Sequence, residues 1–317
     1  MTTGKIVRKE SLMLSATPRS GFKIHPLFET SDHNILEYVL LPVYDGCAYD
    51  VSEQIYILDD SNVDITTDKL SSIAGAKPIS GVKHSFTVTD AERMATNRGN
   101  GWHITNMAAE SANQMLEAVE FGMFNGQIAL ENGLTSLPST NSTTNGSANT
   151  GSTASLGNNT GYAESTTVIT NGVSTVYTAA GKRAINYRGM ENPWGNIWHF
   201  IGGIIINGNR ISRGGLPYIC KDFNYTDNQI GRNYESINFT LPSTQDWVSA
   251  MGYGNSTYDW VYMPIECAET ANSATPIGDK IWTVNNLNGN CVVVSGGMWT
   301  SGTNSGPFYY GCDRTIE

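Results

Sequence analysis

The chain has 317 residues, of which 39% are hydrophobic and 10% aromatic, so it is long enough to bury a core and too apolar to be disordered. Its formal net charge is −10 and it contains no cluster of Lys and Arg, which argues against a nucleic-acid backbone as the partner. The five cysteines are odd in number and widely spaced, which argues against both a disulfide framework and a zinc site.

Residues 1–20 are polar and mixed in charge, and they lack an apolar run of signal-peptide length. We therefore expect residues 1–20 to form an arm or tether, the protein to be made in a cytosol, and one large domain to occupy residues 21–317. The most apolar internal run, residues 198–207, is too short to cross a bilayer, so membrane insertion is not expected.

Apolar and β-branched residues follow the arm and predict the first strands. Residues 22–28 and 34–44 are each predicted to form a strand, and residues 54–58 form another after the turn at residues 45–46. A helix is predicted next, because Thr89-x-x-Glu92 has the spacing of a capping box and Gly99 would end the helix that follows.

A longer helix is predicted over residues 106–130. Apolar residues recur there at three- and four-residue spacing and predict a buried stripe. The stripe consists of Met107, Ala108, Ala112, Met115, Leu116, Val119, Met123 and Phe124. Gly122 and Gly126 weaken a helix, so their presence predicts close packing against another element.

The composition changes after this helix. Residues 139–160 are rich in Ser, Thr, Asn and Gly, so a flexible surface insertion is predicted there. A strand pattern resumes at residues 166–179, and the chain from residue 183 onward is rich in aromatics and Gly. Three further strands are predicted at residues 201–206, 260–265 and 291–294. Two early helices, few strands and many loops indicate an α+β fold with little regular structure.

Four segments resemble known proteins. Residues 187–201 (YRGMENPWGNIWHFI), 70–79 (LSSIAGAKPI) and 98–103 (RGNGWH) resemble stretches of phage structural proteins. Residues 187–201 also resemble a region of formylglycine-generating-enzyme-like domains. Residues 294–309 (VSGGMWTSGTNSGPFY) are similar to a signature of C-type-lectin-like variable domains, including the variable proteins of diversity-generating retroelements.

The resemblance implies a C-type-lectin-like α+β fold with two early helices, short strands and many irregular loops packed by aromatic residues. It implies the scaffold and not an enzyme's activity. Two features depart from the family: the insertion at residues 139–160, and the short tail after Cys312, where such domains often continue into a longer strand.

No pattern in the sequence predicts an enzyme. Formylglycine-generating enzymes use a copper-binding cysteine pair, which Cys291 and Cys312 do not match. No G-x-S-x-G motif occurs, and no two histidines have the spacing of metal ligands on a helix. His103 and His199 are expected to pack and hydrogen-bond within the scaffold. No cofactor is expected; a calcium site at residues 191–193 is the lesser alternative to a proline-containing turn.

The C-terminal part concentrates residues typical of contact surfaces, because aromatics supply contact area and small polar residues adapt their hydrogen bonds. The predicted ligand- or partner-binding residues are Asn286, Asn288, Thr300, Ser301, Asn304, Tyr309 and Tyr310. For these residues a contact role and an ordinary role within the loops both stay open. Five other aromatic residues are predicted to be buried anchors of the loops: Trp102, Trp194, Trp198, Trp299 and Phe308.

These features together predict a non-enzymatic phage virion protein. The first interpretation is a tail- or head-fibre protein or adhesin that displays a ligand- or host-contact surface. The alternative is a decoration or adaptor protein of the capsid or tail that binds no receptor. The expected partners are other virion proteins, through the N-terminal arm, and a host glycan or protein; the chain is expected to form a homo-oligomer and to reside in the virion.

Overall fold

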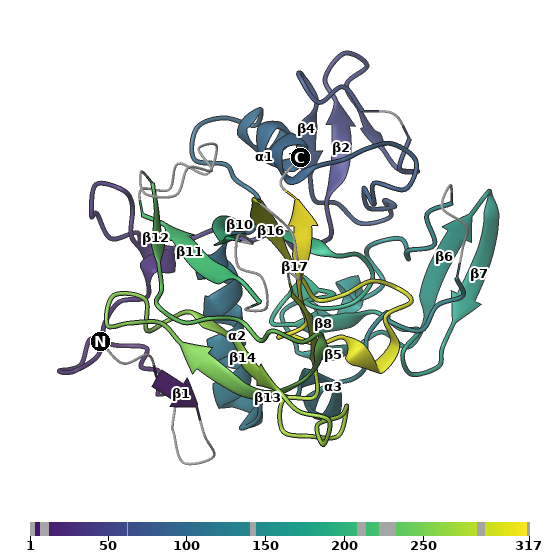
Figure 1. The fold of residues 1–317 in the computed structure, drawn as a ribbon. Coiled ribbons are helices and arrows are strands. Elements are labelled where there is room, and N and C mark those ends of the chain that lie inside the picture. The colour runs from purple at the N-terminus through teal and green to yellow at the C-terminus, as the bar shows by residue number, and fades with distance from the viewer. Residues whose placement is uncertain are drawn as a thin grey trace.

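The fold is mixed α+β, with most of its regular structure in strands (Figure 1). The computed structural model describes residues 4–6, 13–61, 63–139, 144–207, 214–221, 233–283 and 289–315. Within these ranges it contains three α-helices, two of them early in the chain as predicted, and one large sheet with three small ones. No helix in the described part of the chain is long and apolar enough to cross a membrane.

The large sheet brings the first described strand of the chain together with the last ones. Its order is β1 (Gly4–Ile6), β13 (Asp246–Tyr253), β15 (Lys280–Trp282), β17 (Tyr310–Thr315), β16 (Asn290–Ser295), β10 (His199–Asn207), β11 (Leu216–Cys220) and β12 (Tyr234–Ser236), while β14 (Tyr262–Cys267) pairs with β13. Strands β15 and β17 are parallel, and the other neighbouring pairs are antiparallel. The strands predicted at residues 201–206, 260–265 and 291–294 correspond to β10, β14 and β16.

Three small sheets surround the large one. They are β3 (Ile55–Ile57), β2 (Cys47–Asp50) and β4 (Lys69–Ser71); β5 (Gly161–Tyr162), β8 (Ile185–Tyr187) and β9 (Met190–Glu191); and the hairpin of β6 (Thr166–Thr170) and β7 (Val173–Tyr177). The strand predicted at residues 54–58 is β3, and the strand pattern at residues 166–179 forms the hairpin.

Helix α1 spans Val88–Thr96, close to its predicted position, but its capping box is a different one. Thr87 is the N-cap: its side chain accepts a hydrogen bond from the Asp90 backbone amide, and the Asp90 carboxylate accepts one from the Thr87 amide. The predicted box of Thr89 and Glu92 is therefore wrong. The Glu92 carboxylate is buried and instead binds the His103 ring, at 2.5 Å between Oε1 and Nδ1.

Helix α2 spans Met107–Phe121 and ends earlier than predicted, because Gly122 adopts a left-handed conformation with φ of 68°. A separate short helix, α3, then covers Gly126–Ala129. The close packing predicted at Gly126 is confirmed, since a Cβ there would lie 2.7 Å from Cδ of Pro307. The same prediction is wrong for Gly122, where a Cβ would meet no atom of the described residues within 4 Å and the glycine serves the helix end instead. The predicted apolar stripe is only partly buried, since Val119 and Met123 are exposed. The polar residues Ser111, Gln114 and Glu117 are buried on the inward face of the helix instead.

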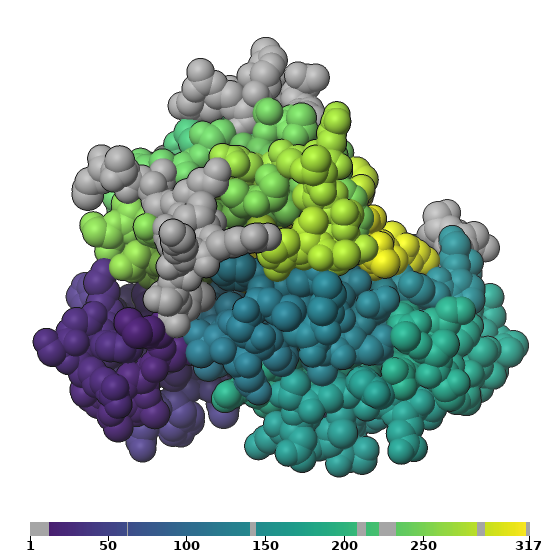
Figure 2. Space-filling view, turned by 90° about the horizontal axis from the view of Figure 1, so that it is seen from below, coloured from purple at the N-terminus to yellow at the C-terminus, as the bar shows by residue number. Residues whose placement is uncertain are grey.

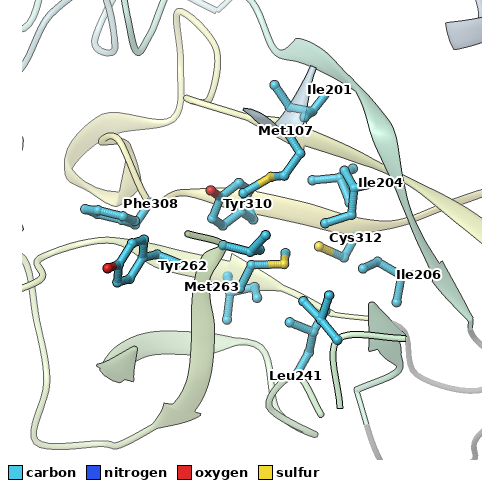
Figure 3. Close-up of a cluster of buried hydrophobic side chains, with 14 of the residues drawn as sticks. Met107, Ile201, Ile204, Ile206, Leu241, Tyr262, Met263, Phe308, Tyr310 and Cys312 are labelled. Carbon is cyan, nitrogen blue, oxygen red and sulfur yellow. The ribbon is translucent and has the colours of Figure 1, made fainter. Parts of the chain in front are cut away.

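The main hydrophobic cluster lies between α2 and the large sheet. Met107 from α2 meets side chains from β10, β14 and β17, among them Ile201, Met263 and Tyr310 (Figure 3). The same cluster contains Phe308, whose ring packs edge-on against Phe124 at 5.3 Å between centroids. The last strand of the chain thus supplies the centre of the core.

Residues 13–43, here called the N-terminal segment, lie at one edge of the molecule (Figure 2, purple). The strands predicted at residues 22–28 and 34–44 are wrong: the segment contains a 3-10 turn at Pro26–Phe28 and a single bridge at Ile35. A strand needs a neighbouring strand for its backbone hydrogen bonds, and no described strand pairs with this segment. Ten of its large apolar side chains remain exposed: Met13, Leu14, Phe22, Ile24, Ile35, Leu36, Tyr38, Leu40, Leu41 and Val43.

Residues 144–153 run through the interior, which contradicts the predicted surface insertion. The buried side chains there are Asn145, Ser147, Ala148, Thr150 and Thr153. Thr153, for example, donates its hydroxyl to the buried Glu191 carboxylate at 2.7 Å. Small polar side chains fit such a position because they satisfy buried hydrogen-bonding groups in little space. Residues 140–143 of the predicted insertion lie outside the described residues.

Candidate functional site

A cavity of about 740 Å³ lies between the N-terminal segment, α2 and β10. Its apolar lining comes from Leu40, Leu41, Val43, Phe86, Trp102, Trp198 and Phe200, and its polar lining includes Asp45, Glu110, Gln114, Glu117 and His199. Cavities of this size, with mostly apolar surfaces and a few polar groups, are typical of small-molecule sites. We therefore take this cavity as the candidate site.

The polar side of the cavity comes from one face of α2. Glu110, Gln114 and Glu117, here called the acceptor row, lie four and three residues apart and so project from the same side of the helix. The Gln114 amide nitrogen donates to the Pro307 carbonyl at 2.6 Å and to the Tyr310 hydroxyl at 2.5 Å. Its carbonyl oxygen Oε1 and the Glu117 oxygen Oε2 are buried and have no hydrogen-bond partner among the described residues.

Burial dominates the electrostatics of the acceptor row. It raises the pKa of Glu110 to about 7, while the charge of His199 opposes the shift. Burial, followed by the charges of Glu110 and Asp279, raises the pKa of Glu117 well above its usual value. A carboxyl group in this position favours its neutral form unless a positive charge approaches it.

His199 lies across the cavity from α2 and is paired. Its Nε2 lies 2.9 Å from Oδ1 of Asp45, and Asn196 donates to Oδ2 of the same carboxylate at 2.7 Å. Burial lowers the pKa of His199, but the hydrogen bond and the charge of Asp45, with the charge of Glu110, outweigh burial and raise the pKa overall. His199 is therefore a hydrogen-bonded scaffold residue, as predicted, and so is His103 through Glu92.

Glu191, the centre of the alternative calcium site, also lines the cavity. Its two carboxylate oxygens accept hydrogen bonds from the Gly151 amide and from the amide and hydroxyl of Thr153, at 2.7–2.8 Å. These oxygens hold residues 144–153 in place, which gives Glu191 a structural role. Among the described residues, no group of three or more His, Cys, Asp or Glu side chains could hold a metal ion.

The predicted aromatic anchors differ in burial. Trp194, Trp299 and Phe308 are buried, as predicted. Trp198 is half-buried and packs against Tyr309, with 4.7 Å between the ring centroids. Trp102 is 43% exposed, so its prediction as a buried residue is wrong: its ring lines the cavity under the Arg98 guanidinium, 4.6 Å away, instead of packing in the core.

Tyr309 and Tyr310 are interior residues, so the structure does not display them as contact residues. Tyr310 is fully buried in the main cluster (Figure 3). Tyr309 is also buried, and its hydroxyl accepts a hydrogen bond from Trp282 Nε1 at 2.6 Å. Strand β17 begins at Tyr310 between β15 and β16, and this central place in the sheet buries both rings.

The remaining predicted contact residues fall into two groups. Thr300, Ser301 and Asn304 lie together, half-buried, in the loop after Trp299. The Ser301 hydroxyl accepts a hydrogen bond from the Met298 amide at 3.0 Å and shapes this loop. Asn286 and Asn288 lie outside the described residues.

The acceptor row was missed by the sequence interpretation. The signal was available in principle, because Glu110, Gln114 and Glu117 follow a helical period beside apolar residues. A polar helical face is normally solvated, however, and this one becomes internal because the N-terminal segment, β10 and the stretch from Pro307 to Tyr310 lie against it. Comparisons add no assignment: a scan against models of protein families and a search of curated proteins found no match.

Proposed function

We propose that this chain is a non-enzymatic structural component of a phage particle, built on a C-type-lectin-like scaffold and attached to a neighbouring subunit by its N-terminal segment. The motifs at residues 187–201 and 294–309 support the scaffold and the phage origin. The mixed α+β fold with two early helices agrees with that scaffold. Of the two interpretations of the sequence, the adaptor is the one that the surface of the molecule favours.

The observation that best supports this attachment is the exposure of the N-terminal segment. Its ten exposed apolar side chains fall within residues 13–43, six of them between Ile35 and Val43, whereas soluble monomers seldom gather so many in one place. Tyr38 and Leu40 are 70% and 72% exposed. Burying such side chains against a neighbour contributes about 1.5–3 kcal/mol each, enough to hold a subunit in an assembly.

Two substitutions on the segment test this attachment. Ile35→Ser with Tyr38→Ser removes apolar area from side chains that do not line the cavity. The melting temperature should stay within about 3 °C, because exposed side chains contribute little to folding. Incorporation into particles assembled with the variant should fall at least tenfold, as measured by quantitative mass spectrometry of purified particles.

The matched control is Val173→Ser with Val176→Ser, which removes two similarly exposed apolar residues from β7. It should leave incorporation unchanged. If the Ile35 and Tyr38 variant enters particles normally, the N-terminal segment is not the attachment surface and the adaptor proposal fails.

The adhesin remains the second candidate, because Trp282 is 38% exposed at the edge of β15 and is held in place by Tyr309. An exposed, oriented tryptophan is typical of contact surfaces. Trp282→Ala particles that assemble normally but adsorb poorly to host cells would favour the adhesin. Normal adsorption of these particles would favour the adaptor over the adhesin.

A further inference from the structure

We propose that the cavity is a binding site for an organic cation, an ammonium or guanidinium group carried on an apolar body, which the acceptor row on α2 receives. Three independent features of the cavity lead to this ligand: the unpartnered acceptors, the engagement of the chain's own cations, and the apolar lining. The inference does not depend on the proposed attachment function, since the acceptor row on α2 carries it, although Leu40, Leu41 and Val43 of the N-terminal segment also line the cavity.

The first feature is the unpartnered acceptors. Glu117 and Gln114 are 3% and 2% exposed, and each presents an oxygen without a hydrogen-bond partner among the described residues. Leaving a buried polar atom unpaired costs about 1–3 kcal/mol. The Gln114 oxygen is an acceptor, and the Glu117 carboxylate is one when it is ionised, so a ligand that satisfies both atoms and stabilises the ionised form must be a positively charged donor. Ammonium and guanidinium groups carry several donors and no acceptor.

The second feature is that the cations that line the cavity are already engaged. Arg98 donates to the Leu70 carbonyl at 3.0 Å and lies over the Trp102 ring. His199 is paired with Asp45, and His103 with Glu92. None of these contacts directs a donor at Glu117, so the positive charge that its carboxylate favours must come from a ligand.

The third feature is the apolar lining. A volume of about 740 Å³ exceeds what a lone ammonium ion would fill, and most of the lining is apolar. An alkyl or aromatic body would pack against Leu41, Val43 and Phe200. The exposed Trp102 ring is also available, and aromatic faces attract cations. The cavity thus pairs an anionic end with an apolar end.

The charges around the acceptor row set the pH dependence of this binding. The titratable groups that interact with Glu110 or Glu117 are His199, Asp279, Glu120, Tyr187 and Tyr310, and Asp45 in turn interacts with His199. A cation binds the ionised carboxylates, so binding should release protons. The affinity should therefore increase from pH 6 to pH 8, through the pKa of about 7 of Glu110 and with loss of positive charge at His199.

Isothermal titration calorimetry of the full chain with hexylammonium tests the proposal, with 1-hexanol as the neutral probe of the same length. Hexylammonium should bind at least tenfold more tightly than hexanol at pH 8. Glu117→Gln keeps the shape of the side chain and removes its charge, and it should weaken hexylammonium binding at least tenfold. Glu120→Gln is the matched control on the same helix, because Glu120 pairs with Arg188 and does not line the cavity.

A capped Leu-Arg-Leu peptide distinguishes the sources of the cation. Binding of both probes, lost in Glu117→Gln and kept in Glu120→Gln, would support a site that accepts a basic side chain of a partner protein. Binding of hexylammonium alone would support a site for a free small molecule. Equal affinity for hexanol and hexylammonium, or equal loss in both Gln variants, would overturn the proposal, and so would the absence of binding by every probe.

Discussion

Tyr310 joins the hydrophobic core to the acceptor row. Its ring is fully buried in the main cluster, and its hydroxyl accepts a hydrogen bond from Gln114 on α2. A buried aromatic ring contributes through its large apolar area, and a buried hydroxyl through the bond that offsets its desolvation. Tyr310 therefore holds β17 in the sheet and also fixes the side chain of Gln114, the middle residue of the acceptor row.

Substitution at Tyr310 separates these two contributions. Tyr310→Ala should lower the free energy of unfolding by about 3–5 kcal/mol, as large-to-small changes of core aromatics do. Tyr310→Phe keeps the ring and should cost only about 1 kcal/mol. Urea denaturation of both variants gives these values. Tyr38→Ala, at an exposed tyrosine, is the control; a Tyr310→Ala variant as stable as this control would show that Tyr310 is not a core residue.

Residues 144–153 are the element whose composition is most misleading. They contain no large apolar side chain, and yet they are held in the interior by hydrogen bonds to elements on several sides. Asn145 donates to Oδ2 of Asp60 at 2.8 Å and to the Pro78 carbonyl at 2.9 Å. Its own side-chain oxygen accepts from the amide and hydroxyl of Ser147. The segment is therefore a structural strut of the fold.

Truncation of Asn145 measures this contribution. Asn145→Ala should destabilise the protein by about 2–4 kcal/mol, because it leaves several buried groups without partners. Asn159→Ala provides the comparison: this residue lies in the same Asn-rich part of the chain but is exposed, and its side chain donates to the nearby Leu156 carbonyl at 2.9 Å. The melting temperature of the Asn159→Ala variant, measured by calorimetry, should stay within about 2 °C of the value for the unchanged protein. Equal stability of the two variants would show that residues 144–153 lie at the surface and do not support the fold.

At the scale of the whole molecule, the buried carboxyl groups make stability depend on pH. Burial raises the pKa of Glu117 and of Asp279 well above their usual values, and His199 also has a raised pKa. The folded state therefore holds protons that the unfolded state releases as the pH rises. His25 opposes this dependence only weakly above pH 6.5: burial lowers its pKa from the usual 6.5 to about 4, so the unfolded state alone still binds part of a proton there, which is worth less than about 0.5 kcal/mol.

The free energy of unfolding should consequently fall from pH 6.5 to pH 8. A group that is protonated only in the folded state contributes about 1.4 kcal/mol per pH unit to this fall, and Glu117, whose pKa is raised by burial, is such a group. Glu117→Gln should remove that part of the slope, and Glu120→Gln should leave it in place. Urea denaturation at four pH values measures the slope; a slope that is unchanged in Glu117→Gln would show that Glu117 is ionised in the folded protein.

Local patterns in the sequence determined where the helices lie and which late segments are strands. Helical spacing is a property of a few consecutive residues, so α1 and the start of α2 were predictable, and so were β10, β14 and β16. Residue type alone also sufficed for Trp194, Trp299 and Phe308, because large rings flanked by tight turns are seldom left in solvent. The absence of a basic cluster and of a catalytic motif followed from composition and spacing.

Only the tertiary structure decided which polar segments became internal and which apolar segments remained outside. Residues 34–44 look like a strand, but no described strand pairs with them, so their side chains stay exposed. Residues 144–153 look like a surface loop, but partners far away in the chain bury them. Tyr310 and the acceptor row are likewise buried by segments that are distant in the sequence. Burial depends on which distant segment lies opposite, and that information is absent from any short stretch of sequence.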